Sequence, residues 1–208
     1  MNSMPSIAAR PGRARATSAA ELGEIGLSLI LERGFDAVTV DDIATAAGIG
    51  RRTFFRYFSS KNDLPWGDFD ALLQRMRAHL AEVPRDAPLA VALREAVVEF
   101  NSFPADTLPQ HRLRMAVLLE TPTLVAHSAL RYESWRRVVA DFVAERLGLP
   151  PRSVGAEALA RACLGISLAA YQHWLGDPDA VLTDLIREGF DEMSIVFGDA
   201  PDDRGGER

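Results

Sequence analysis

The 208-residue sequence lacks several features that mark large classes of protein. It has a single cysteine, Cys163, which excludes an internal disulfide and a cysteine-rich metal site. Its four histidines, His79, His111, His127 and His173, are too scattered to form a metal-binding motif. No glycine-rich phosphate loop, G-x-S-x-G elbow or H-E-x-x-H motif occurs either. We therefore expect no bound metal, no cofactor and no enzymatic activity.

Membrane and secretion signals are also missing from the sequence. We find no apolar run of about 18 residues that would span a membrane. The N-terminus carries Arg10, Arg13 and Arg15 after a short, weakly apolar start, where a secreted protein would have a continuous apolar segment. The sequence therefore predicts a cytoplasmic protein that does not contact a membrane.

Lysine is almost absent, since Lys61 is the only one in the chain. The formal net charge of -6 argues against a general nucleic-acid binder, because affinity for phosphates needs clustered cations. The charge is unevenly distributed, however. Residues 1–61 carry eight Lys or Arg against six Asp or Glu, and the remaining residues carry 15 against 23. We therefore expect only the N-terminal part to face DNA.

Helical periodicity is what the sequence does contain. Hydrophobic residues make up 48% of the chain, which is enough for a core, and no long strand pattern or repeat interrupts their helical spacing. The pattern predicts an all-α fold, with helices bounded by Pro, Gly and capping residues. The expected helices cover about 17–34, 39–47, 51–58, 61–83, 88–103, 107–120, 123–147, 153–175 and 178–197.

The run from Thr39 to Asp63 predicts a helix-turn-helix. Thr39 with Asp42 three residues later resembles a capping box, which starts a helix. Gly48 ends that helix, because glycine adopts the left-handed conformation at little cost. The short turn through Ile49 and Gly50 then leads into a second helix.

The second helix has the composition of a recognition helix. Phe54 and Phe58 are four residues apart, so both can pack inward. Its remaining side chains are then free to face DNA, where Arg can fork onto guanine and hydroxyl groups can bind phosphates. The candidate donors on this helix are Arg51, Arg52, Thr53, Arg56 and Tyr57. Gly23 and Gly26 in the helix before them indicate close packing there, with the recognition helix as one candidate neighbour.

Two further basic elements flank this motif. Lys61 lies at the start of the next helix, where we expect it to bind a phosphate; the alternative is a lysine exposed to solvent. Residues 1–16 are expected to be flexible, either as a plain tail or as a basic arm in which Arg10, Arg13 and Arg15 follow the DNA.

The two last expected helices are apolar on more than one side. Leu159, Cys163 and Ile166 form one stripe on the helix at 153–175, and Leu164 and Leu168 belong to another. A helix with two apolar sides needs two partners. We therefore expect residues 153–175 and 178–197 to pair with a second copy of the chain in a four-helix seam, although a larger monomeric core is the alternative.

Three runs of the sequence resemble the DNA-binding domain of the TetR family of transcriptional regulators. They are ERGFDAVTV at 32–40, DDIATAAGIGRRTFFRYF at 41–58 and SSKNDL at 59–64. The longer run GRRTFFRYFSSKNDLPWGDFD resembles more narrowly the regulators found with mycofactocin biosynthesis clusters. The resemblance implies an all-helical homodimer with a three-helix DNA-binding domain, at 17–64, and an effector-binding and dimerisation domain, at 65–197. The composition itself predicts a flexible basic arm at 1–16 and a disordered tail at 198–208.

The resemblance also implies roles for single residues. It makes Thr39 and Lys61 phosphate contacts and Arg51 and Arg52 base or phosphate contacts. Thr53 and Tyr57 become contacts to the DNA backbone. The chain departs from the family at Gly50, where Ser or Thr is common, and at Phe55, where Tyr is common. We therefore expect this DNA-binding domain to depend more heavily on its arginines.

The effector is expected to bind among the middle helices of the C-terminal domain. Pockets are mostly apolar with a few polar groups, and the candidate lining residues are Phe100, Phe103, Leu108, Met115, Leu118, Leu124 and Trp135, with His173 as a polar contact. Core packing is the alternative for each of them. A largely apolar ligand would fit, with an acyl-CoA as one candidate, its polar end meeting an arginine among Arg112, Arg114, Arg131, Arg136 and Arg137.

These observations predict a ligand-responsive repressor that binds a palindromic operator as a dimer. The competing hypothesis is a helical small-molecule-binding protein or enzyme that keeps the fold without binding specific DNA.

Overall fold

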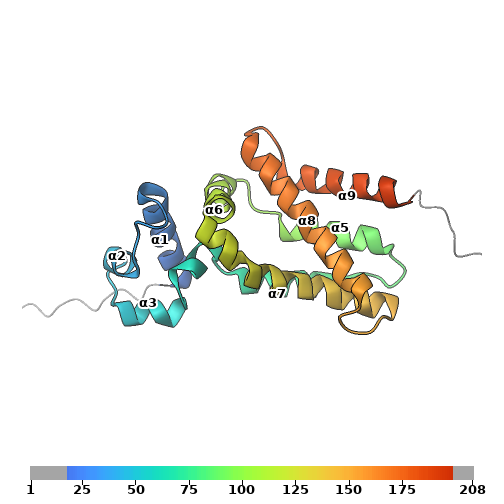
Figure 1. Ribbon diagram of the computed structural model, residues 1–208, viewed down its shortest axis with the longest axis horizontal. Coiled ribbons are helices and arrows are strands. Elements are labelled where there is room, and N and C mark those ends of the chain that lie inside the picture. The colour runs from blue at the N-terminus through green and yellow to red at the C-terminus, as the bar shows by residue number, and fades with distance from the viewer. Residues whose placement is uncertain (1–17, 199–208) are drawn as a thin grey trace, which may run out of the picture. The chain divides into compact units, whose positions relative to one another are not determined.

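The computed structural model describes residues 18–198, and within that range every regular element is a helix (Figure 1). The predicted all-α fold is confirmed. The predictions for the arm at 1–16 and for the tail after residue 198 lie outside the described residues. The chain divides into two compact units between Gly67 and Asp68. We refer to them as the N-terminal and the C-terminal unit.

The N-terminal unit contains α1 (Ala19–Arg33), α2 (Val40–Ala46), α3 (Arg51–Tyr57) and the 3₁₀ helix η1 (Lys61–Trp66). The Ser18 side chain caps α1 by accepting a hydrogen bond from the Glu21 amide. Thr39 and Asp42 form the predicted capping box at the start of α2. As expected, Gly50 gives α3 no side-chain cap. The predicted helix-turn-helix is therefore present.

Two glycines let α1 approach its neighbours closely. A Cβ atom added at Gly26 would lie only 2.3 Å from Leu64 Cδ1 of η1. At Gly23 the nearest atom would be Cζ of Phe58, at 3.9 Å. The expected close packing is therefore present, but at Gly26 the neighbour is η1 and not the recognition helix. Leu64 is fully buried in this contact.

The prediction of a single helix from Lys61 to Val83 is wrong. The chain forms η1, breaks at Gly67 and begins again as α4 (Phe69–Glu82). Gly67 has φ of +57°, a left-handed conformation that favours glycine and ends η1. Asp68 then starts α4, because its Oδ1 accepts a hydrogen bond from the Ala71 amide at 3.2 Å. The apolar spacing continues through this break, so periodicity alone does not reveal it.

The C-terminal unit continues with α5 (Leu89–Phe100), α6 (Leu108–Glu120), α7 (Pro122–Leu147), α8 (Val154–Gly176) and α9 (Leu182–Gly198). These helices match the predicted ones within a few residues. α8 packs on α7 along one side and on α9 along another (Figure 1). α5 packs on α4 and α9. The last helix begins later than expected, because Asp177 accepts a hydrogen bond from the Asp179 amide at 2.9 Å and holds a turn there.

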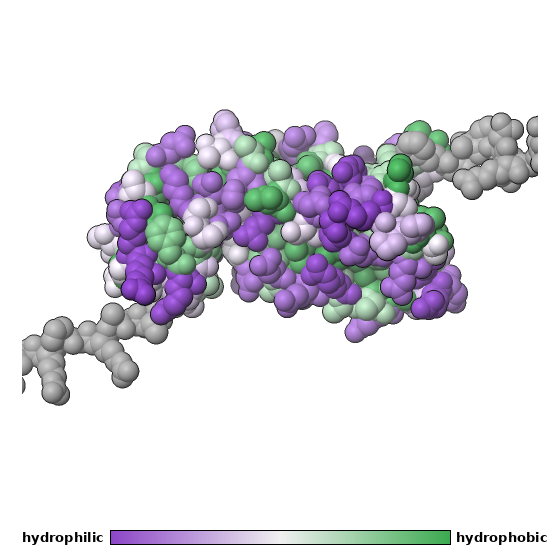
Figure 2. Space-filling view, turned by 60° about the horizontal axis from the view of Figure 1, so that its bottom comes forward, coloured by the Kyte–Doolittle hydropathy of each residue, from purple (hydrophilic) through white to green (hydrophobic). Residues whose placement is uncertain are grey.

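α8 and α9 bury only part of their apolar surface within the described chain. Ile186 of α9 is fully buried, whereas Ile195 and Val196 are 62% and 67% exposed. Figure 2 shows hydrophobic surface beside the end of α9. Leu159 of α8 is 37% exposed.

One helix of residues 18–198, α8, is long and apolar enough to cross a membrane by length and composition. This differs from our expectation that the chain has no such run. Its packing on α7 and α9 makes it a core helix of the C-terminal unit.

The two glycines of α1 make a matched pair for testing this packing. We expect Gly26→Ala to lower the free energy of unfolding by about 1–3 kcal/mol, because the new methyl group collides with Leu64. Gly23→Ala has ordinary contact distances, so its better helix propensity should raise stability by up to about 1 kcal/mol. Urea denaturation followed by circular dichroism measures both. Equal effects of the two substitutions would contradict the close contact between α1 and η1.

Candidate nucleic-acid interface and interior polar cluster

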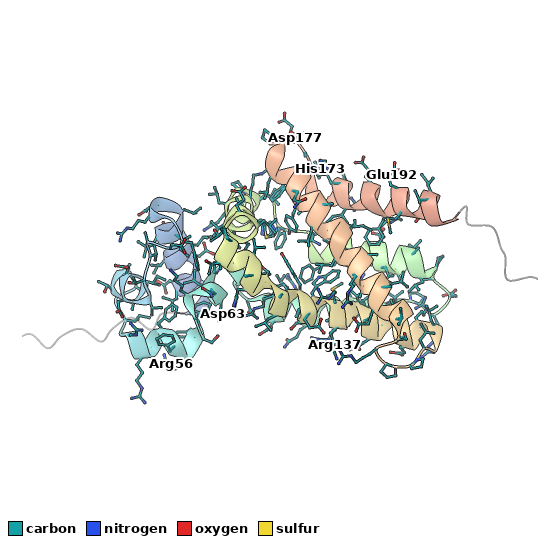
Figure 3. The ribbon with its side chains drawn as sticks, viewed as in Figure 1. Arg56, Asp63, Arg137, His173, Asp177 and Glu192 are labelled. Atoms are coloured by element: carbon teal, nitrogen blue, oxygen red, sulfur yellow. The ribbon has the colours of Figure 1, made fainter. Side chains whose placement is uncertain are left out.

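Burial of two phenylalanines orients α3. Phe54 is fully buried and Phe58 is 7% exposed, with their ring centroids 5.7 Å apart. A helix that buries this side must turn its other side outward, so Arg51, Arg52 and Arg56 are exposed. Figure 3 shows Arg56 pointing away from the ribbon. The predicted inward and outward faces of the second helix are confirmed.

The three arginines of this face differ in their partners. Arg51 donates to Asp41 Oδ2 of α2 at 2.9 Å, and its guanidinium lies 5.6 Å from the Phe55 ring. Arg56 donates to the Tyr57 hydroxyl at 3.1 Å. Arg52 makes no hydrogen bond or ion pair with any residue of the range 18–198. Phe55 is 46% exposed and offers only apolar contact, as expected.

The Thr39 hydroxyl is used within the helix cap. It donates to Asp42 Oδ2 and accepts from the Asp42 amide, and the Thr39 amide also donates to Asp42 Oδ2 at 2.8 Å. These hydrogen bonds from Thr39 lower the pKa of the Asp42 carboxyl. A phosphate contact by Thr39 stays a prediction, and it would require the hydroxyl to turn away from Asp42. Thr53 and Tyr57 are half-buried at the edge of the arginine face.

Lys61 has a structural partner that the sequence did not reveal. Its Nζ donates to the carbonyl oxygens of Phe35 and Val38, both at 2.7 Å, and lies 4.3 Å from the Phe35 ring centroid. The alternative of a lysine exposed to solvent is therefore wrong. An ammonium group has three donors, so one remains for a phosphate, and that contact stays a prediction. These two carbonyls lie 26 and 23 residues before Lys61, so the local sequence pattern could not predict the contacts.

The C-terminal unit contains a buried polar cluster made by Asn101, His111 and Tyr171. The Asn101 amide donates to the Val97 carbonyl at 2.7 Å, which leaves its Oδ1 to accept from the Tyr171 hydroxyl at 2.9 Å. Tyr171 has then used its only proton, so its hydroxyl accepts from His111 Nε2 at 2.8 Å. This chain of hydrogen bonds fixes the proton of neutral His111 on Nε2.

Burial sets the protonation of this cluster. It lowers the pKa of His111 from 6.5 to about 4, with a smaller contribution from the Arg114 charge. It also raises the pKa of Tyr171. The Phe103 ring stacks on the His111 ring, with centroids 3.9 Å apart. His111 is therefore a partly buried residue that is neutral at pH 7.

Arg112, the next residue along α6, also binds α8. Its guanidinium lies 4.1 Å from the Trp174 ring and donates to the carbonyls of Trp174 and Asp177. Trp174 and Asp177 belong to the C-terminal end of α8, where a cation is favourable. Consecutive residues of α6 thus connect it to α8.

The structure separates the predicted ligand-lining residues. Phe100 and Trp135 contact each other with centroids 6.1 Å apart, and Phe103 belongs with His111. Leu118, Leu124 and Trp135 are buried in the core, whereas Phe100, Phe103, Leu108 and Met115 are half-buried. His173 is exposed on the last turn of α8 (Figure 3), because residues two apart on a helix do not share a face and Tyr171 points inward.

A small cavity of about 60 Å³ lies between α4 and α5. Its apolar wall is formed by Leu72, Met76 and Phe100, and Arg75, His79 and Glu99 surround it. Ligand pockets for drug-sized molecules are about 300–1,000 Å³. This cavity is too small for an acyl chain unless the surrounding side chains move.

Family models match both units of the chain. Residues 24–64 match the N-terminal domain of bacterial regulatory proteins of the TetR family. Residues 87–198 match the MftR C-terminal domain of that family. The chain belongs to the TetR family of transcriptional regulators. The predicted resemblance to regulators of mycofactocin clusters is also confirmed.

Individual TetR-family relatives agree with this. The chain is 42% identical over 182 residues to a mycofactocin biosynthesis transcriptional regulator, MftR of Mycobacterium tuberculosis, covering 88% of this chain and 92% of the relative. It is 27% identical over 167 residues to the transcriptional activator FasR of Mycolicibacterium smegmatis, covering 77% and 74%.

Solved structures of the TetR family share the fold. FadR of Thermus thermophilus, a repressor solved in complex with lauroyl-CoA, superposes with a TM-score of 0.58 at 18% identity. The superposition covers 92% of this chain and all of that one. At this identity the likeness establishes the fold alone.

The depressed pKa of His111 predicts a pH dependence of stability. The unfolded chain protonates this imidazole below its ordinary pKa of 6.5, whereas the folded chain does so only near 4. The stability that neutral His111 supports is therefore complete above pH 6.5 and is lost towards pH 4, by up to about 1.4 kcal/mol per pH unit. Thermal denaturation between pH 7 and 4.5 measures this. His111→Gln should flatten the dependence, and His173→Gln, at an exposed histidine of α8, should not. The interior position is contradicted if both variants behave alike.

Proposed function

We propose that the protein is a cytoplasmic, ligand-responsive transcriptional repressor that binds a palindromic DNA operator as a dimer and is released by a small, largely apolar effector. The observation that carries the proposal is the exposed arginine face of α3 above a buried Phe54. In this proposal residues 17–64 bind DNA, and residues 65–197 bind the effector and dimerise. Regulators of this family bind operators and dimerise, and the proposed action requires no catalysis.

The partners of the arginines support different roles in DNA binding. Arg52 has no partner within residues 18–198, so its planar fork is free to pair with O6 and N7 of a guanine. Arg56 lies beside the Tyr57 hydroxyl at 3.1 Å, and the two can bind the DNA backbone together. Thr39, Thr53 and Lys61 would add contacts to phosphates. The absence of a side-chain cap at Gly50 leaves the free amides of α3 to a phosphate or to water.

Dimerisation is supported by the apolar side chains that α8 and α9 leave exposed. Leu159, Ile195 and Val196 would be buried against a second copy of the chain. A two-fold dimer would present two copies of α3 to successive major grooves, about 34–36 Å apart.

We propose an acyl-CoA as the effector. The solved FadR structure contains lauroyl-CoA. In this chain the apolar side chains of Phe100 and Trp135 would line an acyl chain once the side chains around the small cavity between α4 and α5 move apart. The arginines expected to meet its polar end have partners in the free protein: Arg136 and Arg137 bind Glu133, and Arg131 lies 3.5 Å from Asp70. The phosphates of the coenzyme A moiety would therefore compete with these ion pairs. The coupling to DNA is reciprocal, so DNA must weaken effector binding equally.

A gel shift with the region upstream of the protein's own gene tests the proposal. We expect a shift that weakens with salt and that unrelated DNA does not displace at equal concentration. A protein that binds effector but shifts no fragment at any salt concentration supports the other hypothesis, a helical ligand-binding protein or enzyme that does not use DNA.

Arg52→Ala and Lys61→Ala should weaken DNA binding in different ways. Arg52→Ala should reduce affinity by about 1–3 kcal/mol and relax the preference at one base pair, because a forked base contact is lost. Lys61→Ala should weaken binding to all sequences and lower the salt slope by about 1. It should also destabilise the turn between α1 and α2, because two carbonyls lose their donor. Titrations on single-base operator variants distinguish the two, and an unchanged preference in Arg52→Ala would contradict the base contact.

Calorimetry against acyl-CoAs of increasing chain length tests the effector. We expect saturable binding that strengthens with chain length, by about 0.8 kcal/mol per buried CH₂ group. Coenzyme A alone is the control and should bind far more weakly. No saturable heat with any chain length would reject this class of effector.

A further inference from the structure

The ion pair between Asp41 and Arg51 places a negative charge on the proposed DNA-binding surface. Arg51 is the first residue of α3, in the half of a recognition helix that contacts bases. Asp41 Oδ2 accepts a hydrogen bond from an Arg51 terminal nitrogen at 2.9 Å, and the two side chains are 64% and 61% exposed. A carboxylate this close to a DNA-facing arginine repels phosphates, so it must influence how the surface binds DNA.

Asp41 is not needed to start α2. Asp42 and Thr39 already form the capping box there, with both reciprocal hydrogen bonds present. A second acidic residue in the first turn adds a modest favourable interaction with the helix dipole. The contact that distinguishes Asp41 is the one to Arg51 on the other helix of the motif.

The geometry also restrains the Arg51 guanidinium. Asp41 binds it from α2, and the Phe55 ring lies 5.6 Å from its central carbon. A guanidinium has five N–H donors, and a carboxylate on one edge leaves the other edge free for a guanine. The same carboxylate opposes the use of Arg51 as a general phosphate contact, because it supplies the negative charge that a phosphate would otherwise supply.

We propose that Asp41 determines the specificity of DNA binding, by holding Arg51 in position for a base and by opposing contacts to phosphates of non-cognate DNA. Asp41 is a positioning residue that acts through Arg51. This inference rests on the proposed DNA-binding function. It requires that loss of the Asp41 charge strengthens non-cognate binding, whereas a residue that only stabilised α2 would weaken DNA binding when changed.

Asp41→Asn is the test, because asparagine has nearly the same shape and no charge. We expect its affinity for poly(dI-dC) to rise about two- to fivefold, the range that an exposed ion pair can contribute. The salt slope of that binding should steepen by about 0.9, because the released Arg51 gains one phosphate. Selection from a random duplex pool should recover a less restricted set of sequences than the wild type recovers. Thermal denaturation shows whether the variant remains folded.

Asp36→Asn is the matched control. Asp36 is exposed in the same unit and makes no ion pair with another residue of 18–198. The Asp36→Asn substitution removes the same charge but breaks no ion pair within that range. It should therefore leave the salt slope and the selected sequences unchanged.

Three results would overturn the inference. Equal gains in Asp41→Asn and Asp36→Asn would mean that only net charge matters. A folded Asp41→Asn protein with unchanged or weaker non-cognate binding would mean that Asp41 does not oppose phosphate contacts. Both results leave the proposed function intact, whereas a wild-type protein that enriches no sequence from the pool would reject the proposed function and this inference together.

Discussion

Burial of the Phe54 ring is the constraint on which the DNA-facing surface depends. α3 has only seven residues, and Phe54 is the one among them that is buried. Once Phe54 is fully enclosed and Phe58 packs beside it, the opposite side of the helix, with Arg51, Arg52 and Arg56, must face outward. The exposed row of arginines is therefore a consequence of apolar packing, since charged side chains stay at the surface unless paired. Packing decides which way the helix faces, and the arginines decide what that face can bind.

Contacts among α1, η1 and the turn before α2 hold this arrangement in place. α1 comes close to η1 at Gly26, where any side chain would collide with Leu64. Lys61 binds the carbonyls of Phe35 and Val38 and so connects η1 to the turn before α2. Each buried or half-buried carbonyl needs a donor, and here one ammonium group serves two of them. The same residue is a proposed phosphate contact and a structural contact of the N-terminal unit.

Local patterns predicted the parts of this protein that local physics determines. The capping box at Thr39, the inward pair Phe54 and Phe58, and most helix boundaries follow from neighbouring residues, so the sequence was sufficient for them. The break at Gly67 was missed because apolar spacing continues through it. Local patterns cannot predict contacts between residues that are far apart in the sequence. His111 contacts Tyr171, which is 60 residues away, and Lys61 contacts Phe35, which is 26 residues away. For the same reason the sequence pointed to His173, which lies near two aromatic residues in the chain, and not to His111, which contacts them in space.

The proposed function requires that two copies of α3 bind DNA at a fixed spacing. Hydroxyl-radical footprinting of the purified protein on the fragment that it selects from genomic DNA tests this directly. We predict two protected segments of related, inverted sequence on one face of the duplex, with centres about one helical turn apart, and loss of both when an effector is bound. Uniform or single-segment protection, or protection that does not depend on sequence, would contradict it.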